Sequence, residues 1–508
     1  MARAGSRRAR NKERGGQAKT SNAPAYITRK IPFFEFATEE GLVALEDHAD
    51  WIIQEIGVEF RDDPVAIEIW KKAGADVKGT RVRLPKGAAR ELCKTAPEVF
   101  TQHARNPAKT VKIGGPNVVF APIYGAPFVQ IYGEERRYGT IKDFRNLVRL
   151  THMLPSLHHS GFVICEPCDV PVNKRHLDML YAHMVLNDQP MLGAIVQKQF
   201  AEESVDMARL LFGSDFVDDN CVIMGNVNTN SPLLVDKVVS EAARTYCGQG
   251  QGLVAVPFIL SGAMGPVTTA ASIAQALAEA MMVCAFTQLI KPGVPFVLGN
   301  FLSSMNLRSG APTFGMPEPA MSNYIIGQLA RRLKLPLRCG GALTASKIAD
   351  AQAAYESADS MHSTVMGGAN FVLHSAGWLE GGLATGFEKL VLDADRLGVY
   401  QKMLGGIDTG PEGLARDAYL EVEPAGHFLG SQHTMRHYET AFYEAELSDS
   451  QSFEQWSDEG AHDALQRANK RWKSMLKDYK KPAIDPAVDE ALKDYIERKK
   501  SDRADAWY

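Results

Sequence analysis

Short apolar runs alternate with longer amphipathic segments over most of the chain beyond Pro155. The apolar runs cover residues 160–165, 191–196, 221–224, 253–256, 295–298, 335–338 and 371–374. The amphipathic segments between them cover residues 174–186, 201–212, 232–247, 268–289, 317–333 and 348–366. Strands that are apolar on both faces and alternate with helices are typical of a parallel sheet covered by helices. The alternation therefore predicts an α/β fold.

The number of these units favours a closed barrel over an open sheet. Seven or eight β/α units in roughly 270 residues match a (β/α)₈ TIM barrel, and we expect an eighth strand near residues 418–422. An open doubly wound sheet would need a glycine-rich phosphate loop after an early strand. The glycine-rich stretch at residues 248–252 instead precedes a predicted strand. We expect it to be a turn that ends a helix.

Four segments follow from this pattern. We expect a disordered basic tail at 1–35, an α+β region packed on the barrel at 36–155, the (β/α)₈ barrel at 156–447, and a helical C-terminal extension at 448–508. Within the second segment, Thr38 is placed as the N-cap of a helix that Gly57 ends. Short strands are expected at residues 81–84, 110–113, 118–121 and 128–132.

Composition excludes several classes of protein. Lys and Arg total 56 against 60 for Asp and Glu, a formal charge of −4, which argues against a nucleic-acid binder. Seven cysteines in 508 residues are too few for a disulfide framework, which favours a reducing compartment. The longest apolar stretch is interrupted by Glu279, and the basic N-terminus has no apolar segment behind it. We therefore expect a cytoplasmic protein that does not enter a membrane.

Candidate binding residues follow the predicted strands, because barrel chemistry lies at the carboxyl ends of strands. These residues are Glu166, Asn226, Asn228, Phe301, Arg308, Phe314, Gly341, His374 and Trp378. The set is rich in amides and aromatic rings, with single charged groups, and it has neither metal-ligand spacing nor a Ser-His-Asp order. We expect no bound metal and no catalytic side chain. Such a set suits a compact, methyl-rich ligand whose reaction needs little proton transfer.

Each candidate also has a purely structural interpretation. The asparagines at 226–230 can satisfy the backbone of a loop, and Glu166 can anchor a helix or loop. Arg308 can pair with Glu318, and the aromatic residues can belong to the core. These alternatives remain open at the level of sequence.

Several longer motifs carry a family resemblance. The stretches at residues 305–312, 335–341 and 346–352 resemble the trimethylamine methyltransferase family of corrinoid-dependent enzymes. The motifs Gly-His-Phe-Leu-Gly at 426–430 and His-Thr-Met-Arg-His at 433–437 are similar to that family as well. The resemblance implies a TIM barrel, in agreement with the alternation of strands and helices. It also implies transfer of a methyl group from a methylated amine to the cobalt of a separate corrinoid protein.

One departure from the family bears on the substrate. Founding members carry pyrrolysine in a loop that corresponds to residues 340–343, where this chain has only ordinary residues. A chain without pyrrolysine resembles the branch that acts on quaternary amines, of which glycine betaine is the best-known substrate. The product would then be dimethylglycine.

The resemblance also implies partners. The corrinoid-binding string Asp-x-His-x-x-Gly does not occur in this sequence, so we expect cobalamin to arrive on a transiently bound partner protein. The family further implies a homo-oligomer. We expect Arg308, His374 or an asparagine at 226–230 to hold a substrate carboxylate. A barrel lyase or isomerase with Glu166 or His374 as base, and a non-catalytic betaine-binding protein, are the alternatives.

Overall fold

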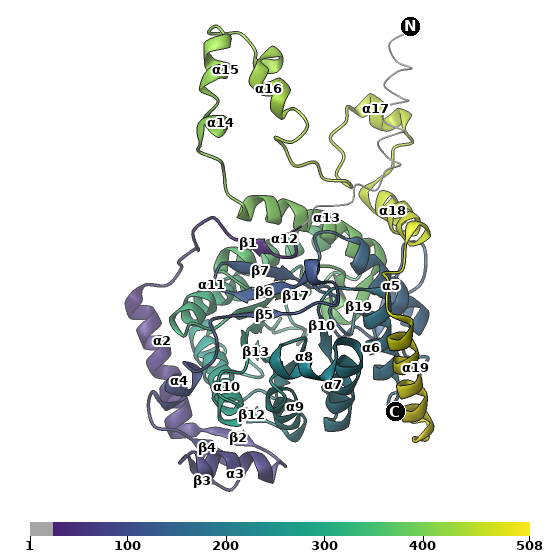
Figure 1. Ribbon diagram of the computed structural model, residues 1–508. Coiled ribbons are helices and arrows are strands. Elements are labelled where there is room, and N and C mark those ends of the chain that lie inside the picture. Colours follow the sequence, from purple (N-terminus) through teal and green to yellow (C-terminus); the bar gives the residue numbers. More distant parts are fainter. Residues whose placement is uncertain (1–23, 508) are drawn as a thin grey trace.

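The computed structural model describes residues 24–507, and its centre is a curled parallel sheet surrounded by helices (Figure 1). The sheet runs in the order β10-β11-β13-β14-β16-β17-β7, and every neighbouring pair in this run is parallel. The strands are β7 Asn117–Phe120, β10 Met191–Gly193, β11 Ile223–Thr229, β13 Gly252–Ser261, β14 Phe296–Gly299, β16 Leu337–Gly340 and β17 Phe371–Leu373. The predicted α/β fold is confirmed, and six of the seven predicted apolar runs form strands.

The amphipathic segments form the helices that cover this sheet. They are α6 Arg175–Leu186, α7 Lys198–Phe212, α8 Ser214–Asp219, α9 Lys237–Gly248, α10 Thr269–Ile290, α11 Pro317–Arg332, α12 Ala351–Gly367 and α13 Phe387–Leu404. Helix α10 is long and apolar enough to cross a membrane by length and composition, but 89% of its most apolar window is buried inside the structure. It is apolar on all sides because the sheet covers one side and N-terminal helices cover another.

The predicted strand at residues 160–165 is wrong, because this segment is irregular. It nevertheless lies between β7 and β10, the two ends of the parallel run. The His158 N–H donates to the Phe120 carbonyl at 2.9 Å, and the Ser160 N–H donates to the Pro190 carbonyl at 2.8 Å. The segment therefore joins both strands without adopting strand geometry.

Histidine side chains replace much of the missing ladder. Nδ1 of His158 accepts the Phe120 N–H at 3.1 Å, and Nδ1 of His159 accepts the N–H two residues further on at 2.9 Å. Nε2 of His183 lies 2.7 Å from the Phe162 carbonyl oxygen. Because these rings accept backbone N–H groups, the segment is held only while His158 and His159 are neutral.

The predicted eighth strand near residues 418–422 is also wrong, because Arg416–Glu421 forms helix α15. Strand β7 supplies a further parallel strand from the N-terminal part of the chain. Three strands continue the sheet from β7 in antiparallel order, namely β1 Ile27–Thr28, β5 Val99–Gln102 and β6 Val111–Gly114. The boundaries of the four predicted segments stay predictions, and the first 23 residues of the tail lie outside the described residues.

The N-terminal region otherwise follows its local signals. The Thr38 hydroxyl accepts the Gly41 N–H, as expected of an N-cap. Gly57 ends the helical stretch with φ +79°, and a Cβ there would lie 2.6 Å from the Val82 carbonyl. The elements are α2 Glu39–Trp51, η1 Ile52–Ile56, β2 Val58–Phe60, α3 Pro64–Lys72, β3 Asp76–Lys78, β4 Arg81–Arg83, α4 Ala88–Cys93, η2 Pro107–Lys109, β8 Phe128–Gln130, β9 Arg137–Tyr138 and α5 Ile141–Met153.

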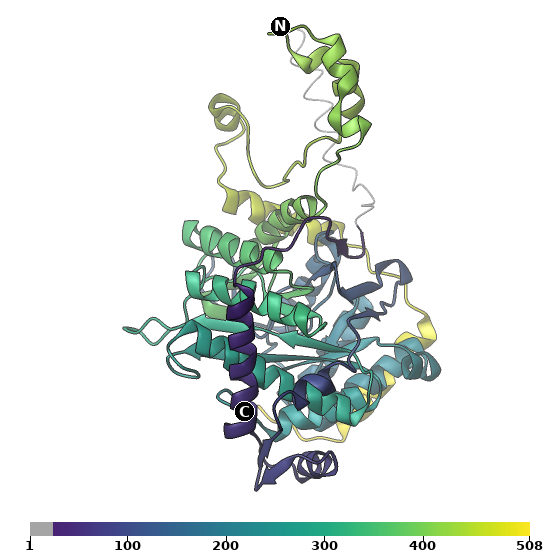
Figure 2. The same cartoon turned by 90° about the vertical axis from the view of Figure 1, so that its left-hand side faces the viewer.

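Beyond α13 the chain leaves the body and returns to it. Short helices project from the body, and the last two helices run along its side (Figures 1 and 2). The Trp472 ring of α18 lies 4.9 Å from the Phe387 ring of α13, so α18 packs on the body. These helices are α14 Pro411–Leu414, α15 Arg416–Glu421, η4 Phe428–Gly430, α16 Gln432–His437, α17 Phe453–Asp458, α18 Ala464–Asp478 and α19 Pro486–Ser501.

Candidate functional site

Four of the predicted residues meet in an aromatic cluster at the carboxyl ends of the strands. Phe301 begins strand β15 (Phe301–Ser304) just after β14, His374 follows β17, and Trp378 begins strand β18 (Trp378–Leu379). The His374 and Trp378 rings lie 4.5 Å apart, and the Phe301 ring lies 5.7 Å from His374 and 5.9 Å from Trp378. Phe314 completes the cluster, 5.8 Å from Trp378. We call these four residues the aromatic cluster.

The backbone around His374 is held in an unusual conformation. His374 has φ +61°, a left-handed value that costs a non-glycine residue energy and is concentrated at functional sites. Gly341 packs directly against this turn, because a Cβ at Gly341 would lie 2.7 Å from the Cα of Ser375. Gly341 therefore contributes close backbone contact and no side chain.

The His374 ring is neutral and has a defined tautomer. Nδ1 accepts the Tyr124 N–H at 3.1 Å, which leaves the ring proton on Nε2. Burial and, to a smaller extent, the nearby Arg338 guanidinium hold the pKa of His374 well below 6.5. His374 therefore offers an uncharged N–H donor next to the aromatic cluster.

Arg338 is a buried cation without an acidic partner. Its side chain is 2% exposed, and its guanidinium carbon lies 5.4 Å from the centre of the Phe301 ring. Nη1 donates to the Asn300 carbonyl at 3.3 Å, but Nε has no hydrogen-bond partner, and no ion pair involves Arg338 among residues 24–507. Burial lowers its pKa to about 10, so the group stays charged at neutral pH.

Sequence reasoning missed Arg338. It ended the predicted strand at residue 338 and sought candidates only among the residues that follow each strand. The available signal was a charged residue inside a segment expected to be buried on both faces, since such residues are almost never buried without a partner.

The two asparagines lie on β11. Gly225 faces helix α9, where a Cβ would lie 2.7 Å from the Tyr246 ring. Because side chains alternate along a strand, Asn226 and Asn228 point to the opposite face of the sheet. Asn226 is buried, and its Oδ1 has no hydrogen-bond partner in the described part of the chain, whereas Asn228 is exposed.

The structure does not bring Glu166 or Arg308 into the aromatic cluster. Glu166 lies 2.8 Å from Arg175, and burial raises the pKa of its carboxyl. Arg308 is exposed on the loop after β15 and forms no ion pair with any described residue. The alternative pairing with Glu318 does not form either, since that carboxylate accepts the Ser304 hydroxyl at 3.2 Å.

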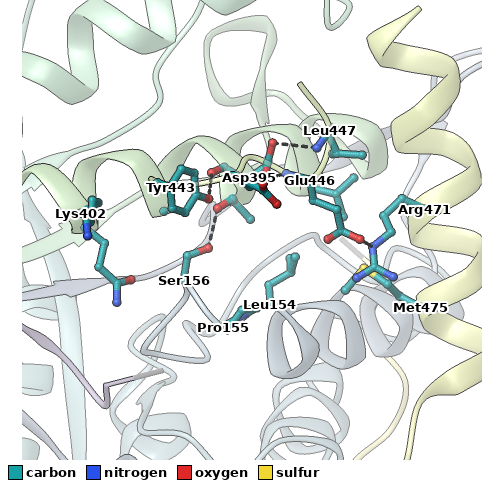
Figure 3. Close-up of a pocket in the computed structure, with 15 residues that line it drawn as sticks. Leu154, Pro155, Ser156, Asp395, Lys402, Tyr443, Glu446, Leu447, Arg471 and Met475 are labelled. Carbon is teal, nitrogen blue, oxygen red and sulfur yellow. Dashed lines mark hydrogen bonds and ion pairs between the residues drawn. The ribbon is translucent and has the colours of Figure 1, made fainter. Parts of the chain in front are cut away.

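A cavity of about 460 Å³, shown in Figure 3, is lined by no residue of the aromatic cluster. It is bordered by α13, by α18 and by the chain that returns to the body at residues 443–447. Asp395 anchors that chain, because its carboxylate accepts the N–H groups of Glu446 at 2.7 Å and Leu447 at 3.1 Å. The cavity contains none of the predicted binding residues, so its size does not make it the candidate site.

Comparisons with known proteins agree with the resemblance. The model of the family described as "Trimethylamine methyltransferase (MTTB)" matches residues 3–504. A glycine betaine methyltransferase of Desulfitobacterium hafniense (strain Y51) is 35% identical over 467 residues, which cover 92% of this chain and 97% of that protein. Trimethylamine methyltransferase MttB of D. hafniense (strain DSM 10664 / DCB-2) is 25% identical, with 91% and 93% covered. A proline betaine:corrinoid methyltransferase of Eubacterium limosum is also 25% identical, with 93% and 99% covered. The chain belongs to the trimethylamine methyltransferase family.

Proposed function

We propose that this protein transfers a methyl group from a quaternary amine that carries a carboxylate to the Co(I) of a separate corrinoid protein. Glycine betaine is the proposed substrate and dimethylglycine the product. The observation that carries the proposal is the buried Arg338, which has no carboxylate partner among residues 24–507 and lies beside the aromatic cluster. The similarity to a glycine betaine methyltransferase supports the same substrate.

An anionic ligand explains why Arg338 is buried. An uncompensated buried charge is costly, and a carboxylate that forms charge-assisted hydrogen bonds with the guanidinium offsets that cost. His374 Nε2–H is a second donor, and like Arg338 it lies beside the Phe301 ring. Asn226 of β11 is buried as well, and in this proposal its Nδ2 is a third donor. In this proposal, Arg338 takes the anchoring role that sequence reasoning gave to Arg308.

The aromatic cluster faces the ammonium end of the proposed substrate. Cation–π contacts contribute about 0.5–2 kcal/mol per well-placed ring. Positive charge leaves the nitrogen as its methyl departs, so a very tight aromatic cage would stabilise the ground state more than the transition state. Anchoring the remote carboxylate instead orients one methyl without opposing the reaction.

The remaining chemistry needs little from this chain. The corrinoid, carried by a partner protein, supplies the Co(I) nucleophile. The C–N bond breaks and its electron pair stays on nitrogen, which gives a neutral tertiary amine, so no general acid is needed. Phe301, Phe314 and Trp378 exclude water, while Arg338 and His374 orient the substrate. The corrinoid partner is supported by the name of the Eubacterium relative and by the missing corrinoid-binding string.

The test combines purified protein, reduced free cobalamin and a panel of amines, followed by absorbance. Loss of the Co(I) band with formation of dimethylglycine is expected for glycine betaine and not for trimethylamine. Two analogues of the substrate separate the halves of the site. 3,3-Dimethylbutanoate keeps the carboxylate and should inhibit, whereas choline keeps only the ammonium and should not.

Two outcomes would contradict the proposal. Turnover of trimethylamine in preference to every betaine would remove the carboxylate anchor. Betaine binding without methyl transfer, in the presence of an active family member as control, would favour the betaine-binding alternative. A lyase or isomerase would instead act without any cobalt.

The proposal also includes the state of the protein. The curled sheet and residues 158–164 would together form a closed eight-membered barrel. The protein would be a homo-oligomer, because apolar side chains such as Val267 and Leu307 are exposed and a second copy would cover them. A reducing, cytoplasmic location fits its seven free cysteines. Light scattering after size-exclusion chromatography measures the oligomeric state directly, and a monomer at micromolar concentration would contradict the proposed oligomer.

A further inference from the structure

The segment from residue 405 to residue 446, which we call the projecting arm, has almost no core of its own. It contains the short helices α14, α15 and α16, and Figure 2 shows it standing away from the body. Among its residues only Ala418 and Ser431 are buried. Ile407, Leu420 and Phe442 are each 87–90% exposed. Apolar burial within this chain therefore does not stabilise the arm.

Both ends of the arm are nevertheless fixed to the body. At its start the Lys30 N–H donates to the Leu404 carbonyl at 2.8 Å. At its end the Tyr443 hydroxyl donates to the Asp395 carbonyl at 3.0 Å, beside the carboxylate that caps the returning chain. Helices of four to six residues are unstable in isolation. A cross-link inside the arm would supply what packing does not.

Three side chains of types that bind metal ions meet between α14 and α16 of the projecting arm. His433 and His437 lie one turn apart on α16, and their rings are 4.6 Å from each other. Glu412 of α14 faces both histidines. Its side-chain Oε2 lies 2.8 Å from His437 Nε2, and its main-chain carbonyl oxygen lies 2.9 Å from His433 Nε2. One ligand atom from each residue lies within 4.8 Å of the others.

We propose that Glu412, His433 and His437 bind a divalent transition-metal ion of the Zn²⁺ type and thereby cross-link α14 to α16. Imidazole nitrogen and carboxylate oxygen are ordinary zinc ligands, and a tetrahedral ion needs its ligand atoms about 3.4 Å apart. Small side-chain rotations from the observed spacing achieve this. A water molecule takes the fourth position.

A nearby arginine does not block the site. Arg436 Nη2 lies 2.7 Å from Asp417 Oδ2 but 3.4 Å from the nearer Glu412 oxygen. The guanidinium is therefore held mainly by Asp417, and Glu412 stays available to the histidines. Asp417 and Arg436 then act as the surrounding pair that keeps Glu412 in place.

The sequence contains part of the evidence for this metal site. The four-residue spacing of His433 and His437 places both rings on one face of a helix. Glu412 is 21 residues from His433, and only the fold shows that α14 returns to α16. No cluster was expected, because candidates were sought only at the ends of barrel strands.

The test measures Zn²⁺ bound by chelator-treated protein in competition with a chromophoric chelator. About one tightly bound ion per chain is expected for the unmodified protein, and none for His433→Ala combined with His437→Ala. His427→Ala is the matched control, because this histidine also lies in the arm but outside the cluster, and it should keep the ion. Co²⁺ in place of Zn²⁺ should give a visible absorption band that the double variant lacks.

Limited proteolysis tests whether the bound ion cross-links the arm. Chymotrypsin cleaves beside exposed aromatic and leucine side chains, which the arm presents at Leu420 and Phe442. Zn²⁺ should slow cleavage within the arm about tenfold in the unmodified protein and in His427→Ala, but not in the double variant. Equal zinc content in all three proteins, or cleavage that ignores zinc, overturns the proposal.

Discussion

The aromatic cluster and the projecting arm are stabilised by opposite means. Around His374 and Trp378 every ring packs against another ring, and the His374 backbone is held by hydrogen bonds to the backbones of Pro122 and Ala342. The arm has two buried residues between its attachment points, and its largest apolar side chains face solvent. The cluster is thus built by the fold as a whole, whereas the arm depends on a few polar contacts between its own short helices.

This difference predicts how strongly a substitution in each region affects the stability of the protein. A buried polar network fails when one member is lost, since the remaining members have no water to bind. An exposed segment tolerates the same substitution, because solvent replaces the lost contact.

The largest effect on stability is expected at the buried ion pair between Lys389 and Asp393. Lys389 Nζ lies 2.5 Å from Asp393, whose carboxylate also accepts the Gly377 N–H at 2.9 Å, and all of these groups are buried. Asp393→Ala leaves a buried ammonium unpaired and should lower the free energy of unfolding by about 3–5 kcal/mol, measured by urea denaturation.

The double variant Lys389→Met with Asp393→Leu is the control for this pair. It removes both charges and should recover most of the lost stability, because no unpaired charge remains. If the single Asp393→Ala variant is as stable as the unmodified protein, the unpaired Lys389 ammonium does not destabilise the fold.

Acidification should weaken the irregular segment between β7 and β10. Burial lowers the pKa of His158 to about 4, of His159 to about 3 and of His183 to about 4, against 6.5 for a free histidine. Below about pH 6.5 the unfolded chain therefore binds protons that the folded chain does not, so stability falls as the pH falls. From pH 7.5 to 6.0 we expect a loss of about 2.5 kcal/mol from these three groups.

The same denaturation experiment at the two pH values measures this loss. His158→Gln should show a smaller dependence than the unmodified protein, and the exposed His462→Gln should show the full dependence. Equal stability at both pH values would mean that the three rings take up protons in the folded protein as readily as in the unfolded chain.

These regions also show what the sequence reveals and what it does not. Six strands were predictable because residues such as 253–256 and 371–374 are apolar on both faces. The strand prediction at residues 160–165 failed because the Gly161 N–H bonds to the His159 ring and the Phe162 carbonyl bonds to the His183 ring of α6, contacts that an apolar pattern does not record. Likewise, the four aromatic-cluster residues were predictable from their positions after strands, whereas Arg338 was missed because it lies inside one.

Substitution of Arg338 is the next test, and it concerns binding. Arg338→Met removes the proposed carboxylate anchor while keeping the volume, and a charge-assisted hydrogen bond is worth about 2 kcal/mol. The KM for glycine betaine should therefore rise about 30-fold. Stability should not fall, because an apolar side chain replaces a buried unpaired charge.

Arg308→Met is the matched control for that variant. Its guanidinium is exposed and unpaired within the described residues, so KM should stay within about twofold. If Arg308→Met raises KM and Arg338→Met does not, the anchor lies on the loop, and the buried arginine serves the structure alone.

The smallest effect on stability is expected in the arm. It is measured by comparing one leucine of α13 with one leucine of the arm. Leu390 of α13 is fully buried, and Leu390→Ala should cost about 2–5 kcal/mol of unfolding free energy. Leu420 is 90% exposed, and Leu420→Ala should change it by less than about 0.5 kcal/mol. Urea denaturation at low protein concentration compares the two. A cost for Leu420→Ala that grows with protein concentration would show that this side chain is covered in an assembly, because subunit association then contributes to stability.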